Sequence, residues 1–399
     1  MRWLLAFAVL LAQEAAEPLR LPPEEFGRRR AALAERLPGG ALVLDSGALR
    51  EPGDDANTPL LDFRYLAGFH DAQGLLVLAD GKAHVFTGDA VRAGAGIDGV
   101  HDLSTFPAWA AENLAGKKVL AKLRPKNLDL LRKAAPGAEV VTGPLRDELV
   151  RMRLVKNAAE VRLIRKASEA TAAAFREIMK RLRPGMNEKD VQAMVLGAYK
   201  ANGCPEVGFP PILGAGKNGT VLHYMANDKE IAAGTLLLCD IGASCDGYST
   251  DITRTFPVSG RFDDDQRKAY QCVLDAHKAA EAALRPGATF GDLDRAARSV
   301  FAERGLTKWS YAHSKDFAVR HGIGHYVGLN VHDAGTYREK FAPGMVVTIE
   351  PGWYDKDAGY GIRIEDTYLV TEGGGERLSS SAPREIAEIE RAMRPRKDY

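Results

Sequence analysis

Two carboxylates interrupt an apolar stretch of the chain, LLLCDIGASCDGYSTDITRTF (residues 236–256). Asp240 follows a strand-like run, and Asp251 follows a turn. If the chain turns at residues 245–246, the two acids are directly opposed in a hairpin, and if it turns at residues 246–247 they are diagonal neighbours. Both registers place them on one face, roughly 5–8 Å apart at Cβ. Because like charges on a half-buried face repel each other, the pattern predicts a proton or a cation between them.

A second stretch, GMVVTIEPGWYDKDAGYGIRIEDTYLVT (residues 344–371), repeats this arrangement. Glu350 and Glu365 each stand at the end of a strand-like run. Their separation is odd, so a connecting loop with an even number of residues would place both carboxylates on one face. Four acids in two apolar hairpins are difficult to explain as ordinary surface carboxylates, which are usually exposed.

Histidines accompany the acids. The segment HGIGHYVGLNVHD contains His321, His325 and His332, and its glycines favour a loop or strand over a helix. His223 stands apart in VLHYMAND and, alone, is typical of a packed histidine. If residues 326–331 are extended, the odd spacing turns His325 and His332 to opposite faces.

This donor set indicates a particular metal chemistry. Hard oxygen ligands outnumber the imidazoles, which favours a pair of Mn²⁺-like ions over a thiolate zinc site. Two such ions about 3.5–4 Å apart activate a water for attack on an amide. The four cysteines (Cys204, Cys239, Cys245 and Cys272) have no metal-finger spacing and are too few for a disulfide scaffold, so we expect buried thiols.

The helices and strands that must position these residues are expected to form two domains. Up to about residue 150, helix-like and strand-like runs alternate, with a helix expected over 26–37 and strands over 41–47, 74–80 and 82–88. They predict a smaller α/β domain over residues 18–150. We place the boundary near residues 151–156, before a catalytic domain over residues 151–395.

The second domain contains an internal repeat. LRPGMNEKDVQAMVLGAYKANG begins at Leu182, and LRPGATFGDLDRAARSVFAERG begins at Leu284. Each copy predicts a helix end at Arg-Pro-Gly, a polar cap with an acid three residues later, and a second helix stopped by glycine. Two related halves that face each other would place a site at their seam.

The N-terminus has the pattern of a targeting signal. A basic start and the apolar run WLLAFAVLLA (residues 3–12) are too short to span a bilayer and predict a signal peptide over residues 1–16. We therefore expect an exported protein, periplasmic or secreted, with a cytoplasmic location as the alternative. No membrane association is expected after processing.

The overall composition is that of a globular protein. Hydrophobic residues make up 45% of the 399 residues and charged residues 27%, and the formal net charge is +1. A chain with so little net charge has no bulk attraction for polyanions, so no nucleic-acid partner is expected. We expect a homodimer or higher homo-oligomer.

Together, CDIGASCDGYSTDITRTF, HGIGHYVGLNVHD, TIEPGWY and GIRIEDTYLVT resemble the pita-bread metallopeptidases, which include aminopeptidase P, prolidase and methionine aminopeptidase. The resemblance covers residues 150–395. The segment 57–78 is similar to the creatinase-type N-terminal domain of the Xaa-Pro branch. The resemblance implies an α+β chain, in which a C-terminal pita-bread fold with pseudo-twofold halves follows a creatinase-like α/β domain.

The resemblance also implies roles for the site residues. It assigns five ligands to two divalent ions, with Mn²⁺ expected and Co²⁺ or Zn²⁺ as alternatives: Asp240, Asp251, His325, Glu350 and Glu365. Asp251 and Glu365 would bridge the ions, and Glu350 would also carry the proton. His223 and His332 would contact the scissile amide and the developing oxyanion, and Arg363 would brace the ligands.

The implied substrate is a peptide with proline after the scissile bond, either at a peptide N-terminus or in an Xaa-Pro dipeptide. Two alternatives remain open. One is a methionine aminopeptidase-like enzyme, which the N-terminal domain disfavours. The other is a metal-free creatinase-like hydrolase or binding module, and the intact ligand set disfavours it.

Overall fold

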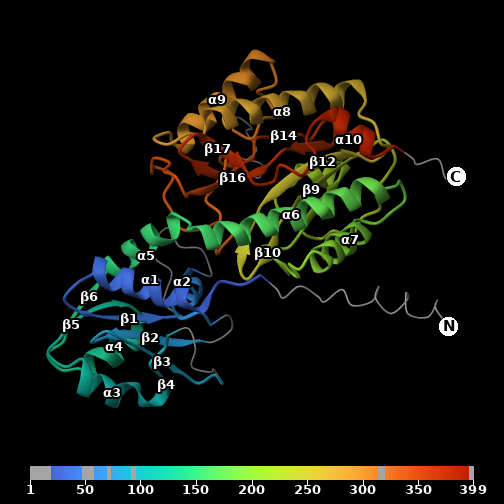
Figure 1. Ribbon diagram of the computed structural model, residues 1–399. Helices are drawn as coiled ribbons and strands as arrows, with labels where there is room; N and C mark the ends of the chain where they lie inside the picture. Colours follow the sequence, from blue (N-terminus) through green and yellow to red (C-terminus); the bar gives the residue numbers. More distant parts are fainter. Residues whose placement is uncertain (1–18, 47–57, 70–72, 91–95, 313–319, 395–399) are drawn as a thin grey trace, which may run out of the picture.

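The computed structural model describes residues 19–46, 58–69, 73–90, 96–312 and 320–394. The expected signal peptide lies outside these residues. Within them, two sheet-containing parts follow each other along the chain (Figure 1). No helix in the described ranges is both long and apolar enough to cross a membrane.

The N-terminal part is built on a six-stranded mixed sheet of order β4-β3-β2-β1-β5-β6. Its strands are β1 (Ala41–Asp45), β2 (Gly74–Ala79), β3 (Lys82–Thr87), β4 (Gly99–Asp102), β5 (Lys118–Lys122) and β6 (Glu139–Thr142). Its helices are α1 (Pro23–Arg36), α2 (Thr58–Ala67), the 3₁₀ turn η1 (Leu103–Thr105), α3 (Phe106–Asn113), α4 (Pro125–Ala134) and α5 (Pro144–Leu154). The expected helix and three strands are confirmed to within a few residues at their ends.

Helices cover both faces of this sheet because both faces are apolar. Along β1, Leu42 and Leu44 point to one core, which α1, α2 and α5 share with the C-terminal part. Ala41 and Val43 point to a second core under α3 and α4. Figure 1 shows α3 and α4 on the side of the sheet that faces away from the C-terminal part.

The C-terminal part surrounds several short sheets with helices. Its helices are α6 (Ala158–Arg181), α7 (Glu188–Ala201), the 3₁₀ turn η2 (Gly216–Thr220), α8 (Asp264–Ala283), α9 (Phe290–Glu303) and α10 (Ile386–Ala392). Its first strands are β7 (Glu206–Val207), β8 (Ile212–Ala215), β9 (Leu236–Ile241), β10 (Ala243–Cys245), β11 (Tyr248–Ser249) and β12 (Ile252–Pro257). The later strands are β13 (Val346–Ile349), β14 (Gly352–Asp355), β15 (Tyr360–Arg363), β16 (Asp366–Thr371) and β17 (Gly374–Arg377).

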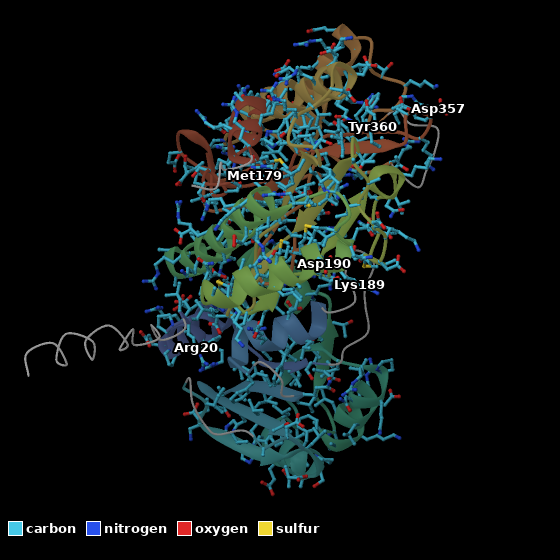
Figure 2. The ribbon with its side chains drawn as sticks, turned by 90° about the vertical axis from the view of Figure 1, so that its right-hand side faces the viewer. Arg20, Met179, Lys189, Asp190, Asp357 and Tyr360 are labelled. Carbon is cyan, nitrogen blue, oxygen red and sulfur yellow. A yellow bond between two sulfur atoms is a disulfide. The ribbon has the colours of Figure 1, made fainter. Side chains whose placement is uncertain are left out.

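The internal repeat corresponds to two helix pairs, α6 with α7 and α8 with α9. Both second helices begin with the expected cap: Asn187 with Asp190, which is labelled in Figure 2, and Thr289 with Asp292. Asp190 and Asp292 each accept the backbone N–H of the cap residue, and the Asn187 side chain also accepts the backbone N–H of Lys189. In Figure 1 the strands β9, β12, β14 and β16 lie between the two helix pairs.

The domain boundary expected at residues 151–156 stays a prediction, since one buried core continues across it. Helix α5 ends at Leu154 and α6 begins at Ala158. Between them, Val155 forms a β-bridge with Met345, so this junction is tied to the C-terminal sheets.

The expectation of four free thiols is wrong for two of the cysteines. Cys204 and Cys245 form a disulfide with a Cα–Cα distance of 4.8 Å, whereas Cys239 and Cys272 are free and buried. The pair meets because β10 pairs with β7, just after Cys204. Closing a loop of this length removes entropy from the unfolded chain, an effect of about 4 kcal/mol in the chain-entropy description.

Candidate metal centre

The first pair of acids lies on the β9–β12 hairpin. Asp240 is paired with Thr253, so Asp251 is its diagonal neighbour, as the second of the two expected registers requires. The chain turns at Asp246 and Gly247, whose φ angles of 49° and 82° are those of a two-residue hairpin turn. The two carboxylates therefore reach the same side of the sheet.

The second pair follows the same logic. In β14 and β15, Gly352 is paired with Arg363, and in β13 and β16, Ile349 is paired with Asp366. Glu350 and Glu365 lie between these pairs in the same register, and the turn at residues 356–359 has an even number of residues. The prediction that these glutamates share a face is confirmed.

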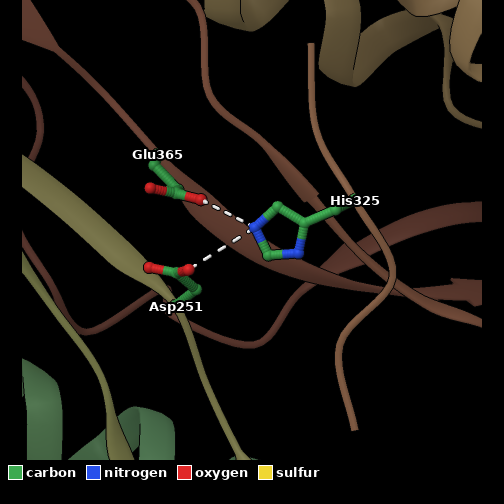
Figure 3. Close-up of side chains that lie close together, drawn as sticks. All are labelled: Asp251, His325 and Glu365. Atoms are coloured by element: carbon green, nitrogen blue, oxygen red, sulfur yellow. Dashed lines mark ion pairs between the residues drawn. The ribbon is translucent and has the colours of Figure 1, made fainter. Parts of the chain in front are cut away.

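His325 brings the two pairs together (Figure 3). Its Nε2 lies 3.4 Å from an Asp251 oxygen, 3.7 Å from a Glu350 oxygen and 3.8 Å from a Glu365 oxygen. Its Nδ1 lies 3.1 Å from the backbone carbonyl oxygen of Tyr326, which orients the ring and leaves Nε2 facing the acids. One ligand atom each from Asp251, His325 and Glu365 lies within 4.8 Å of the other two.

Three of the carboxylates, those of Asp240, Asp251 and Glu365, each have one buried oxygen without a hydrogen-bond partner among the described residues. Arg363 Nη2 donates to one oxygen of Asp240 at 2.6 Å, and Thr253 donates to one oxygen of Glu365 at 2.7 Å. The other oxygen of Asp240, the other oxygen of Glu365 and Oδ1 of Asp251 are the three without a partner. Buried polar atoms are normally paired, so these oxygens point to a missing partner that accepts their lone pairs.

The electrostatics indicate that this partner is a cation. Burial, followed by the charge of Asp240, raises the pKa of Asp251 well above its ordinary value. Burial and the charge of Asp251 do the same to the pKa of Glu365, and burial raises the pKa of Glu350 to about 7. Without positive charge between them these groups cannot all ionise at neutral pH, and oxygen-rich, thiolate-free surroundings suit a hard divalent ion.

All eight residues predicted for the site line one cavity of about 390 Å³. They are the five ligand candidates together with His223, His332 and Arg363. Apolar side chains complete the wall, among them Phe209, Ile212 and Leu222. A cleft with an apolar wall and convergent polar groups is typical of a site for a small ligand.

Comparison with known proteins agrees with this geometry. The family model described as metallopeptidase family M24 matches residues 162–372. Xaa-Pro aminopeptidase of Escherichia coli (strain K12) is 32% identical, over 93% of this chain and 97% of that protein. The chain belongs to family M24.

Further relatives place this M24 metallopeptidase in the aminopeptidase P branch. Xaa-Pro aminopeptidase of Haemophilus influenzae is 32% identical over 95% of this chain and 99% of that protein. The solved structure of aminopeptidase P from Escherichia coli with the inhibitor Pro-Leu has a TM-score of 0.80, with 29% identity over 94% of this chain and 98% of that one. The predicted family and fold are confirmed, and the protein is a hydrolase.

The condition for opposite-facing histidine rings in the M24 site, an extended segment over residues 326–331, is not met. The rings of His325 and His332 do not face opposite ways, and their centroids are 4.0 Å apart. The intervening segment is bent, because the backbone N–H of Asp333 donates to the carbonyl of Tyr326 at 2.9 Å. His332 therefore stands beside His325 while remaining outside the three-residue cluster.

The structure adds two residues to the M24 site for which no role was predicted. His321 Nε2 lies 2.9 Å from the Tyr354 hydroxyl, which accepts a hydrogen bond from Arg363 at 2.9 Å. His321 Nδ1 lies 3.4 Å from Glu350, and burial followed by the charge of Arg363 lowers the pKa of His321 to about 3. Each had a sequence signal of the same kind: His321 lies in the histidine motif, and Tyr354 is the last residue of TIEPGWY.

Proposed function

We propose that the protein is an Xaa-Pro aminopeptidase with a binuclear metal centre. It would release the first residue of a peptide whose second residue is proline. The observation that carries the proposal is the buried cluster of carboxylates around His325, with unpaired oxygens turned to one cavity. Relatives aligned over more than nine-tenths of the chain are Xaa-Pro aminopeptidases, and this supports the substrate class.

The five predicted ligands would hold the metals: Asp240, Asp251, His325, Glu350 and Glu365. Asp251 and Glu365 would bridge, with Mn²⁺ as the expected ion and Co²⁺ or Zn²⁺ as alternatives. Such an ion pair, when bound, makes a water nucleophilic at neutral pH and polarises the substrate carbonyl.

The protein groups around the ligands would orient the substrate and move the proton. Glu350, which lines the cavity beside His325, would accept a proton from the attacking water at a carboxylate oxygen and pass it to the leaving nitrogen. That nitrogen belongs to proline and carries no N–H before cleavage. His332 and His223 would donate to the carbonyl oxygen and the scissile amide, while Arg363 holds Asp240 in place.

A panel of three peptides with the Mn²⁺-loaded enzyme tests the substrate class. An Xaa-Pro-Yaa tripeptide should be hydrolysed at the Xaa-Pro bond, and a Met-Ala peptide should be left intact. An Xaa-Pro dipeptide cleaved faster than the tripeptide would reassign the activity to a dipeptidase. Cleavage of the Met-Ala peptide alone would refute the proline preference.

We also propose that the protein is exported. The leader at residues 1–16 has the pattern of a signal peptide, and the Cys204–Cys245 disulfide suits an oxidising compartment. A chain that lacks residues 1–16 should fold and hydrolyse the tripeptide as the full-length chain does. The proposal fails if the truncated chain is insoluble while the full-length chain purifies as soluble, monodisperse protein.

The expected homodimer or higher homo-oligomer stays a proposal as well. Sedimentation velocity on the purified enzyme measures it directly. A single species with the mass of one chain, 43.3 kDa, at micromolar concentration would contradict it.

A further inference from the structure

A chain of buried charges runs from the N-terminal sheet to the loop that carries His332. Its members alternate in sign and come from β5, α2, the end of α5, the loop after His332 and the α5–α6 junction: Lys122, Asp62, Arg153, Asp333 and Lys156. Arg153 is the central link, with Nη1 2.7 Å from Asp62 and Nη2 2.5 Å from Asp333. Each of these side chains is at most 3% exposed.

Stability is a weak explanation for this arrangement. Moving ions out of water costs about as much as their mutual attraction returns, and apolar side chains of the same volume often serve as well. Arg153 also leaves its Nε buried without a hydrogen-bond partner in the described part of the chain. Its guanidinium is placed to join two carboxylates that belong to different parts of the fold.

One of those carboxylates controls the shape of the loop that carries His332. The Asp333 side chain packs so closely on Gly328 that a Cβ at residue 328 would lie 2.1 Å from Oδ2. The backbone N–H of Asp333 closes the loop on Tyr326 at 2.9 Å. Lys156 Nζ, 3.1 Å from the same carboxylate, supports it from the other side. His332 is the adjacent residue, so the contacts that fix Asp333 also restrict the backbone of His332.

The charge state of Asp333 agrees with this geometry. Burial alone would raise its pKa, but Arg153 and Lys156 hold the pKa below the ordinary value. The carboxylate is therefore ionised, and its two oxygens are pulled towards two fixed cations.

We propose that Arg153 is a positioning residue for His332: it clamps Asp333, and thereby holds the His332 imidazole beside His325 in the cavity. This inference rests on the proposed peptidase function. Asp62 holds the other end of the guanidinium, so the N-terminal part of the chain contributes to the geometry of the active site. Arg153 acts through Asp333 and touches no substrate.

A double-mutant cycle with His332 tests the proposal. Arg153→Met should lower kcat for the tripeptide about 10- to 100-fold, because small displacements of a catalytic group have effects of this size. The change in KM should be small and the metal content unchanged. In a His332→Ala background the same substitution should lower kcat less than about twofold, because the group that it positions is gone.

Arg153→Lys keeps the charge but cannot bridge both carboxylates, so its kcat should lie between those of the wild type and Arg153→Met. If Arg153→Met fails to fold, Arg153→Lys replaces it in the double-mutant cycle with His332→Ala. Arg29→Met is the matched control, because Arg29 is a buried arginine that contacts Glu160 and Tyr248 across the same junction without reaching the His332 loop. It should leave kcat unchanged.

Hydrogen exchange provides a readout that needs no turnover. Backbone amides of residues 326–333 should exchange faster in Arg153→Met than in Arg29→Met. A wild type that hydrolyses no Xaa-Pro peptide would refute the proposed function, and exchange would still test the clamp. Equal losses of kcat in both backgrounds, an unchanged kcat, or unchanged exchange would overturn the role of Arg153.

Discussion

Asp251→Asn and Glu365→Gln should each remove most of the bound metal and lower kcat/KM by at least about 10³-fold, since even outer residues around metal ligands change affinity by 10- to 100-fold. Both substitutions keep the side-chain volume and remove one negative charge. The two acids would bridge both ions, so each loss affects the whole centre. The wild type should approach about two ions per chain after loading with Mn²⁺.

Thermal unfolding checks the same prediction without activity. In the metal-free protein, burial and neighbouring charge raise the pKa of Asp251 and Glu365, so each ionised carboxylate opposes folding at neutral pH. The neutral variants should therefore unfold at a higher temperature than the metal-free wild type. Saturating Mn²⁺ at about 100 times its Kd should stabilise the wild type by about 2.7 kcal/mol and the variants far less.

Elemental analysis and tripeptide hydrolysis on the same preparations complete the test. Glu376→Gln is a suitable control. Glu376 is an exposed carboxylate that pairs with Arg165 and does not line the cavity. It should keep the metal, the activity and the response to Mn²⁺. A wild type that retains almost no metal at saturating Mn²⁺ would contradict the binuclear centre.

His332→Ala should keep both metals and lower kcat by about 10²- to 10³-fold, the usual loss when one oxyanion donor is removed. The ring lines the cavity and stands 4.0 Å from His325, yet it lies outside the cluster of Asp251, His325 and Glu365. From there it can donate to the carbonyl oxygen as negative charge develops. KM should change much less than kcat, because the contact strengthens in the transition state.

Metal content and turnover must be measured on one preparation of His332→Ala. His101→Ala in the N-terminal sheet controls for the loss of an imidazole outside the cavity, and it should change neither quantity. Undiminished turnover would remove His332 from the mechanism. Loss of one metal would instead make His332 a ligand and change the set of five.

Local rules explain how much of the site could be predicted. Side chains alternate along strands, so the spacing of Asp240 with Asp251, and of Glu350 with Glu365, already placed each pair on one face. The caps at Asn187 and Thr289 depend only on residues three positions apart, and both formed as expected. The apolar run that begins β1 likewise needed no tertiary information to predict a strand.

Only the tertiary structure decided how these local pieces meet. The bend between His325 and His332 depends on contacts of the loop with β13 and with Asp333, and the disulfide depends on the pairing of β10 with β7. Arg153 and Asp333 are 180 residues apart, so no periodicity along the chain relates them. By itself the sequence predicted the residues that gather in the cavity and the faces they occupy, because hairpin parity and helix caps act over a few residues. The approach of the two hairpins, the histidine loop and the N-terminal sheet arises from burial of a shared core, which sums contacts between distant segments.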